Sequence, residues 1–409
     1  MQQTHLRRAE DYIKTYGYIP IDNLEAVLAV MPEWLADEVR ARQAKLEEVA
    51  VDYGKPIAFT TGFGRAEVSE RVADKLTISR VITQLSSQYG VQFKEDNRAG
   101  IPQTLHRISA IRDRHDTIIG LTFRFARVVV GAADPVIPYI RKLGSTLLIG
   151  PPGVGKTTLL REIARLLAEE LGPKVIAIDP TGEIGGDGDV PHPAIGLARR
   201  MPVISTPGTS YARMLAKAYL EALTNHGPVA IVGDEVGYEE DVAVVETIAR
   251  RGVNVITTVH GRVLRDVLRN PVLAPLVGYP DNDARRLRGE PVFKVAIEVL
   301  ARGHFRVHTN VERSLEELLQ GKTPTEVVEI LPPERRGGRE RTEEDFYPLI
   351  QRAVAGELPE IYVGTQSLRE TVLHGAALLQ MGQKGAAIEL LEKAEAILEA
   401  WQSGQQVTG

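Results

Sequence analysis

One eight-residue stretch, Gly150-Pro151-Pro152-Gly153-Val154-Gly155-Lys156-Thr157, matches the phosphate-binding pattern G-x-x-x-x-G-K-[ST] in full. An apolar run at residues 146–149 precedes it and predicts a buried strand. Residues 159–171 follow with apolar side chains at helical spacing. Strand, glycine loop and helix in this order predict a nucleotide site, because backbone N–H groups and the helix N-terminus all face the phosphates.

The loop residues also predict the cofactors. Lys156 is expected to reach the β- and γ-phosphates, and the Thr157 hydroxyl is expected to ligate Mg²⁺. We therefore expect ATP and Mg²⁺ to bind here. The predicted nucleotide-binding residues are Gly150, Pro151, Pro152, Gly153, Val154, Gly155, Lys156, Thr157 and Thr158.

The composition is typical of a globular protein, with 43% hydrophobic and 25% charged residues among 409. A net charge of −5 does not favour a nucleic-acid coat or a membrane-surface binder. The absence of cysteine excludes disulfides, thiolate metal sites and cysteine nucleophiles. We see no secretory signal after Met1 and no apolar run near the roughly 18 residues of a membrane span. A cytoplasmic location is expected.

Changes in pattern along the chain predict four segments. We expect an N-terminal α/β domain over residues 1–134 and a P-loop ATPase core over residues 135–331. A charged, Pro- and Gly-rich linker is expected over residues 332–345, followed by a helical tail over residues 346–409. Within the tail, residues 373–391 fit a helical hairpin or a single tetratricopeptide pair. The hairpin is favoured because one repeat lacks neighbours.

The predicted elements give an α/β fold class. In the N-terminal domain we expect two helices over residues 21–51 and antiparallel strands within residues 100–130. In the core, near-continuous apolar strands alternate with helices, which predicts a parallel sheet covered on both faces. Residues 293–309 are expected to form a hairpin. The core strands are predicted at residues 146–149, 175–178, 229–232 and 253–258.

Polar residues that end these strands are candidates for catalysis, because ligands lie at the carboxyl ends of strands in open α/β sheets. Asp234 and Glu235 resemble a Walker B pair, in which Asp234 would hold Mg²⁺ and Glu235 would activate water. Glu183 is a competing candidate for the base. His260 could contact the γ-phosphate or serve only a structural role.

An arginine usually neutralises charge in phosphoryl transfer. Residues 98–127 hold six arginines, and the best candidates for an arginine finger are Arg127 and Arg124. Arg199 and Arg200 are alternatives. The same stretch could instead be a nucleic-acid track or an exposed face of a sheet, which is the common reason for a run of charges. The glycine-acid loop at residues 185–192 lacks the spacing of a calcium loop and predicts no dedicated metal site.

These motifs together resemble the plastid- and cyanobacterium-encoded P-loop ATPases related to stage III sporulation protein AA. The resemblance covers about residues 24–311 and is carried by residues 95–101, the phosphate loop, residues 183–196 and Asp234-Glu235. More distantly, the order of motifs is similar to that of secretion and pilus-retraction ATPases, which are hexameric rings with a RecA-like core. The resemblance implies the same plan, with Glu183 as base and Arg124 or Arg127 reaching the nucleotide.

The tail departs from some relatives. Those relatives end in a small nucleic-acid-binding domain marked by an arginine and, after three intervening residues, a histidine. In this sequence Glu370 stands four positions before His374, so that signature is absent.

We therefore expect a Mg²⁺-dependent ATPase, oligomeric and possibly hexameric, that works on an unidentified client protein. Two rivals remain. One is a nucleic-acid-dependent ATPase that uses the arginines of residues 98–127. The other is an ATP-binding scaffold with a helical docking tail. DNA- or RNA-stimulated turnover would favour the first, and absence of turnover would favour the second.

Overall fold

The computed structural model describes residues 6–16, 18–61, 65–94, 96–204, 208–279, 286–332, 346–358, 362–363 and 366–380, with residues 387, 390–391, 394–395 and 398. The chain divides into two compact units, Met1–Pro332 and Pro333–Gly409. Almost all of the predicted linker, residues 333–345, lies outside the described residues. The four predicted segment boundaries stay predictions.

The first part of unit one is an antiparallel sheet with helices. Its elements are α1 (Ala9–Tyr16), α2 (Leu24–Leu28), α3 (Glu33–Arg42), β1 (Leu46–Asp52), β2 (Pro56–Thr61), β3 (Arg65–Val72), α4 (Lys75–Tyr89), β4 (Arg98–Gly100), β5 (Arg107–Arg112) and β6 (Ile118–Arg124). The sheet order is β3-β2-β1-β6-β5-β4, and every neighbouring pair is antiparallel. Helices α2, α3 and α4 bury apolar side chains against it. This confirms the antiparallel strands expected within residues 100–130.

Sequence reasoning was wrong about residues 43–51, which it placed in a helix. Helix α3 ends at Arg42, and β1 begins at Leu46. Leu46, Val49 and Val51 are fully buried in the apolar core, and β1 pairs with both β2 and β6. The helix-forming residues of this segment are overridden because pairing on both sides and burial on the sheet outweigh local preference.

The second part of unit one is built around the phosphate loop. Its elements are α5 (Ile137–Leu143), β7 (Thr146–Gly150), α6 (Lys156–Leu171), η1 (Gly172–Lys174), β8 (Val175–Asp179), η2 (Pro193–Ile195), β9 (Arg199–Pro202), α7 (Tyr211–His226), β10 (Ala230–Glu235), α8 (Glu239–Arg250), β11 (Asn254–His260), α9 (Leu264–Arg269), α10 (Ala274–Val277), β12 (Val295–Ala301), β13 (His304–His308), α11 (Val311–Leu319) and β14 (Val327–Ile330). The sheet order is β14-β13-β12-β7-β11-β10-β8-β9. From β12 to β9 all neighbours are parallel, whereas β13 and β14 are antiparallel additions.

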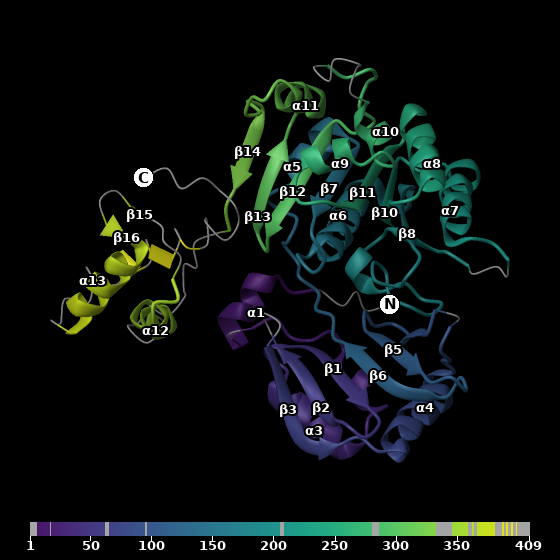
Figure 1. Cartoon of the computed structure of the whole chain (residues 1–409). Helices are drawn as coiled ribbons and strands as arrows, with labels where there is room; N and C mark the ends of the chain where they lie inside the picture. Colours follow the sequence, from purple (N-terminus) through teal and green to yellow (C-terminus); the bar gives the residue numbers. More distant parts are fainter. Residues whose placement is uncertain are drawn as a thin grey trace. The chain divides into compact units, whose positions relative to one another are not determined.

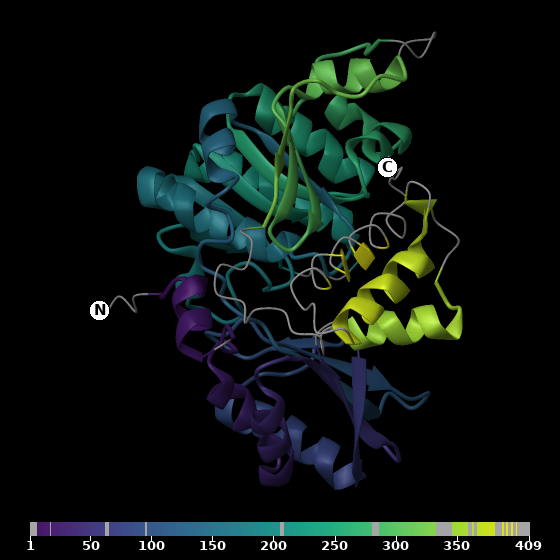
Figure 2. The same cartoon turned by 90° about the vertical axis from the view of Figure 1, so that its left-hand side faces the viewer.

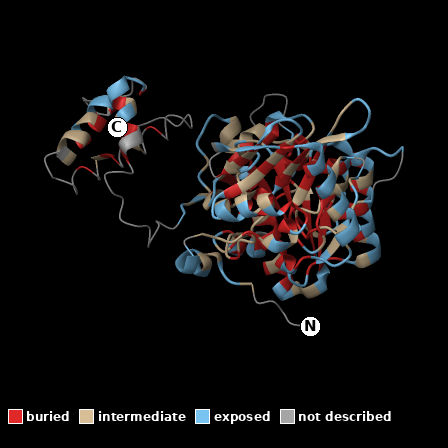
Figure 3. Ribbon diagram, turned by 90° about the horizontal axis from the view of Figure 1, so that it is seen from below, coloured by how far each residue is buried: buried red, intermediate tan, exposed pale blue. Residues whose placement is uncertain are grey.

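Helices cover both faces of this sheet (Figures 1 and 2). Successive residues of a strand point to opposite faces. Leu148 of β7 therefore packs with α6, while Leu147 and Ile149 pack with α7, α8 and α9. Figure 3 shows these buried positions filling the interior of the unit. The predicted α/β core with a mostly parallel sheet is confirmed, and β7 and β10 lie one strand apart with β11 between them.

The second unit is described only in part. It contains α12 (Tyr347–Ala355), β15 (Tyr362–Val363), β16 (Gln366–Ser367) and α13 (Leu368–Gln380). These elements share a small apolar core that includes Phe346, Leu368 and Val372. Most of the second helix of the predicted tail hairpin, from residue 386 onward, lies outside the described residues. The hairpin therefore stays a prediction.

Candidate active site

The phosphate loop connects the end of β7 to the first residue of α6 (Figure 1). Gly153 and Gly155 have φ angles of 78° and 103°, in the region that favours glycine. A Cβ atom at either position would meet nothing within 4 Å, so the backbone conformation alone requires glycine there. The first amides of an α-helix have no intrahelical partner, so this position of the loop at the start of α6 suits an anion.

The side chain of Lys156 points back toward the first residues of the phosphate loop. Its Nζ donates hydrogen bonds to the carbonyl oxygens of Gly150 and Pro151, at 2.6 and 3.0 Å. Burial lowers the pKa of Lys156, against the opposing effect of Glu235 and Asp234. Within the described residues, the ammonium forms its hydrogen bonds with carbonyls and has no carboxylate in ion-pair contact, and a phosphate would supply that negative charge.

Asp234 stands at the end of β10 among other carboxylates. Burial, together with the negative charges of Glu183, Asp179 and Glu235, raises the pKa of Asp234 to about 7. The Thr181 hydroxyl donates to its carboxylate at 3.4 Å, and the Thr257 hydroxyl donates to its backbone carbonyl at 2.5 Å. A cation would relieve this crowding of negative charge, so the donor set fits a divalent ion.

The donor set for such an ion is small. Among the residues that the structure describes, no group of three or more His, Asp or Glu side chains could hold a metal ion. Magnesium characteristically keeps waters and binds through one or two protein ligands together with substrate phosphates. Thr157 and Asp234, the two residues predicted to hold Mg²⁺, carry a hydroxyl and a carboxylate, which are oxygen ligands of the kind that this mode of binding uses.

Glu235 and His260 are brought together at the ends of adjacent strands. The Nε2 of His260 lies 2.7 Å from Oε2 of Glu235, and both side chains are about half exposed. His260 also pairs in register with Gly150, the first residue of the phosphate loop. The structure thus places two predicted residues in direct contact beside the loop.

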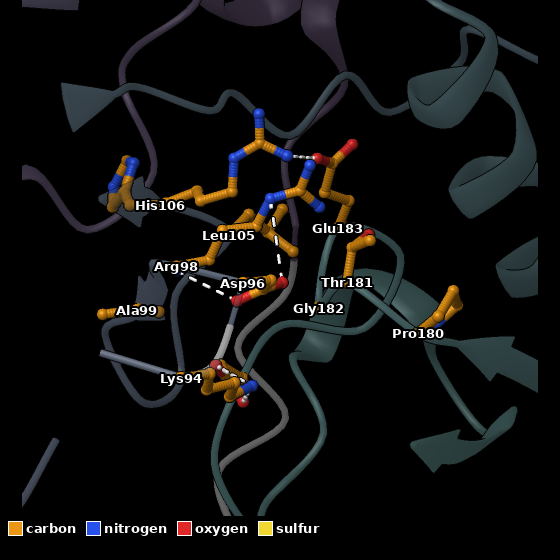
Figure 4. A pocket seen from close by; sticks show the side chains of 13 residues that line it. Lys94, Asp96, Arg98, Ala99, Leu105, His106, Pro180, Thr181, Gly182 and Glu183 are labelled. Carbon is orange, nitrogen blue, oxygen red and sulfur yellow. Dashed lines mark hydrogen bonds and ion pairs between the residues drawn. The ribbon is translucent and has the colours of Figure 1, made fainter. Parts of the chain in front are cut away.

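Glu183 lies in a pocket between the antiparallel sheet and the loop after β8 (Figure 4). Its carboxylate forms an ion pair with Arg107 of β5, shown as a dashed line. Arg161 of α6 binds the carbonyls of Glu183 and Ile184, the latter at 3.0 Å. The carboxylate of Asp179 accepts hydrogen bonds from the amides of Ile184 and Gly185, at 3.2 and 2.8 Å. The segment that carries Glu183 is therefore fixed from both sides.

Arg127 is bound to backbone carbonyls of the N-terminal part, and its role as an arginine finger stays a prediction. Its guanidinium donates to the carbonyls of Gln43, Leu46 and Ile19, at 2.6 to 2.8 Å. Gln43 is the C-cap of α3, where unpaired carbonyls and the helix dipole favour a cation. These contacts give Arg127 a structural role at a helix end that sequence reasoning did not foresee.

The other candidate arginines are also engaged. Arg124 donates to Glu48 at 3.1 Å, and Arg200 donates to the carbonyls of Gly186 and Gly188. The remaining arginines of residues 98–127 have partners as well, which weighs against a continuous nucleic-acid track. The ion pairs are Arg98 with Asp96, Arg107 with Glu183, and Arg112 with Asp116, and Arg114 contacts His115.

Arg107 is one of the six arginines of residues 98–127, but the sequence did not single it out as a site residue. Arg107 begins β5 and lies opposite Arg124 in the β5–β6 register. Burial lowers the pKa of Arg107, while Glu183 acts in the opposite direction. No local pattern marks this residue, because its partner is 76 positions away in the chain.

No helix within the described ranges is both long enough and apolar enough to cross a bilayer.

Comparisons with known proteins identify relatives. The sequence profile of the family described as "Sporulation stage III, protein AA" matches residues 107–280. "Protein SEEDLING PLASTID DEVELOPMENT 1" of Arabidopsis thaliana is 37% identical over 365 residues, covering 83% of this chain and 52% of that protein. "Uncharacterized protein ycf45" of Cyanidium caldarium is 34% identical over 319 residues, covering 74% of this chain and 92% of that protein. The chain thus spans about half the length of the Arabidopsis relative. The predicted family resemblance is confirmed.

Among solved structures, the chain is similar to the pilus retraction motor PilT, crystallised with bound ADP. The sequences are 15% identical, and the match covers 71% of this chain and 89% of that chain. The TM-score is 0.47.

Proposed function

We propose that the function of this chain, which belongs to the family of the ycf45 protein of Cyanidium caldarium, is Mg²⁺-dependent hydrolysis of ATP. One observation carries the proposal: a glycine loop with a buried lysine follows β7, and a partly buried pair of carboxylates ends β10, with only β11 between these two strands. Phosphoryl transfer needs positioned positive charge at the phosphates and a carboxylate for the metal and the water. This site offers both.

The residues of the loop would bind the triphosphate. The amides at the start of α6 face the phosphates, and Lys156 exchanges its two carbonyl partners for phosphate oxygens. Thr157 and Asp234 would hold Mg²⁺, which would neutralise phosphate charge. Asp234 would serve as a carboxylate ligand, and the charge of the ion would offset the repulsion that raises the pKa of Asp234.

Contacts favour Glu235 over Glu183 as the residue that activates water. Glu183 has its carboxylate engaged by the Arg107 guanidinium, a permanent cation. Among the described residues, the ion-pair partner of Glu235 is an imidazole, that of His260, which is not a permanent cation and can move with the γ-phosphate. We assign Glu235 as base, His260 as its positioning partner, and Glu183 as the residue that holds Arg107.

Hydrolysis would be coupled to conformational work. Arg107 belongs to the antiparallel sheet, whereas Glu183 belongs to the loop after β8, so their ion pair joins the two parts of unit one. Loss of the γ-phosphate would alter the charge balance around this pair and move one part against the other. An oligomer, possibly a hexamer, acting on a client protein remains our proposal, as does a cytoplasmic location.

The test compares isosteric variants in single-turnover phosphate release. E235Q should lower the rate by a factor on the order of 100 or more, because general-base catalysis is lost. E183Q should lower it less. The matched control is E239Q, whose side chain is exposed at the start of α8 and should leave the rate unchanged. If E183Q abolishes turnover while E235Q retains it, the assignment of the base is wrong.

A further inference from the structure

The glycine-acid loop at residues 185–192 has no role in the chemistry above, yet it lies against residues 100–105 of the N-terminal part. Gly186 has a φ of 77°, and a Cβ there would lie 2.7 Å from the carbonyl oxygen of Thr104. Gly188 has a φ of 87°, and a Cβ there would lie 3.0 Å from the Cβ of Pro102. Only glycine permits so close a contact between these backbones.

We infer that Asp22 is a positioning residue for the catalytic site, acting through His192 to hold the loop that carries Glu183. The Oδ1 of Asp22 lies 3.1 Å from Nε2 of His192, although the two residues are 170 positions apart. Their side chains are only 11% and 5% exposed. This contact is a latch between the N-terminal part and the core.

The surroundings of His192 fix which ring nitrogen carries the proton. Its Nδ1 accepts a hydrogen bond from the amide of Ala194 at 3.0 Å, so Nδ1 is unprotonated. Its Nε2 therefore carries the hydrogen and donates to Asp22. A neutral imidazole satisfies both contacts, because Nδ1 caps η2 while Nε2 forms the latch.

Asp22 is itself held firmly. Its second carboxylate oxygen accepts from the amide of Leu105 at 3.0 Å, and its own amide donates to the carbonyl of Ala126 at 3.0 Å. Its carbonyl contacts Nε2 of His106, whose Nδ1 accepts from the Ala126 amide at 3.1 Å. Burial acts to raise the pKa of Asp22, but the bonds from His192 and Leu105 outweigh it and keep that pKa below its usual value.

The latch connects to Glu183 through consecutive contacts. The amide of His192 donates to the carbonyl of Gly185 at 2.8 Å. The amides of Gly185 and Ile184 are bound by Asp179, and Ile184 directly follows Glu183. A shift of the loop would therefore move the carboxylate that holds Arg107, and small displacements around a reacting centre have large effects on rate.

The two nitrogens of His192 permit a matched pair of variants. In H192Q the side-chain amide can take the place of Nε2 and keep the bond to Asp22, but it loses the cap on Ala194. In H192N the side-chain oxygen can take the place of Nδ1 and keep the cap, but it cannot reach Asp22. The inference predicts that H192N and D22A lower kcat about tenfold or more while KM for ATP changes little, because catalytic geometry rather than ATP binding is lost. H192Q should stay close to wild type.

Two further variants test the same contact. The double variant D22A/H192N should lose no more than D22A alone, since H192N removes a contact that D22A has already removed. K94M removes the exposed ion pair between Lys94 and Asp187, which also joins this loop to the N-terminal part. It should change kcat little, because an exposed pair contributes little.

The inference rests on the proposed hydrolysis, and kcat alone does not separate the two. Hydrogen exchange of the backbone amides is therefore measured on the same proteins. Amides of residues 184–190 should exchange faster in D22A and H192N than in wild type, whether or not the wild type turns over. Absence of wild-type turnover would contradict the proposed function, and hydrogen exchange would still test whether the contact between Asp22 and His192 holds the loop. Equal loss of kcat in H192Q and H192N, or unchanged exchange in D22A, would overturn the inference.

Discussion

Replacement of Asp234 by asparagine should stabilise the nucleotide-free protein, and the gain should grow with pH. Asparagine keeps the size of the side chain and removes its charge. In the wild type, burial and three neighbouring carboxylates raise the pKa of Asp234 from 3.8 to about 7. The folded chain therefore binds a proton on Asp234 at pH values where the unfolded chain has released it.

The direction and size of the change in unfolding free energy with pH follow from the difference between the folded and unfolded pKa values of Asp234. Because the folded pKa is the higher one, the stability contributed by protonated Asp234 is full below about pH 3.8 and is lost as the pH rises through about 7. Between pH 5 and pH 8 the wild type should lose about 2.7 kcal/mol from this group. Asp234 is partly exposed, so solvent screening reduces the expected figure to about 2 kcal/mol. The asparagine variant has no such loss.

The assay is calorimetric unfolding of wild type and D234N in chelator at pH 5, 6, 7 and 8. The difference in Tm between the two proteins should widen by roughly 3 °C across this range, because the unfolding entropy grows with chain length and unit one spans Met1–Pro332. Other titrating groups cancel in the comparison. Addition of Mg²⁺ with a non-hydrolysable nucleotide should stabilise the wild type more than D234N, because D234N lacks the predicted carboxylate ligand of the metal. A difference in Tm that does not vary with pH would refute the electrostatic reasoning.

Two other variants test the packing around the site. G233A should destabilise the chain by about 2 kcal/mol or more, because a Cβ there would overlap the buried Tyr219 ring. A Cβ at Gly237 would meet no atom closer than an ordinary contact of 3.9 Å, so the control G237A should unfold near the wild-type temperature. An unchanged Tm for G233A would contradict this packing. R127A should cost about 2 to 3 kcal/mol by leaving the carbonyls at the end of α3 unpaired, as measured by urea unfolding. Lost turnover in R127A at unchanged stability would instead restore the prediction of an arginine finger.

The phosphate loop and the core strands were predictable because their signals are local. The glycines and Lys156 stand within eight residues, and β7, β8, β10 and β11 are apolar runs that each end in a polar residue or glycine. Burial on both faces of a parallel sheet produces such runs directly. The edge strands β3 and β14 escaped prediction because their exposed faces carry charged residues, such as Glu67 and Glu329, that interrupt the apolar pattern.

The contacts that join the two parts of unit one could not be predicted. Arg107 meets Glu183, and Asp22 meets His192, across 76 and 170 positions of chain. Each pair depends on how the antiparallel sheet packs on the loop after β8, and no periodicity encodes that packing. Arg127 illustrates the same limit, since its carbonyl partners at the end of α3 are fixed by tertiary structure.

Calorimetric titration of the purified chain with ATP in the presence of Mg²⁺, followed by assay of phosphate release from the same sample, measures the central claim directly. The account predicts saturable binding and turnover in the wild type. It predicts loss of both in K156A, which lacks the only side-chain amine that the phosphate loop supplies. A wild-type chain that binds no ATP, or a K156A variant that hydrolyses it at the wild-type rate, would contradict the account.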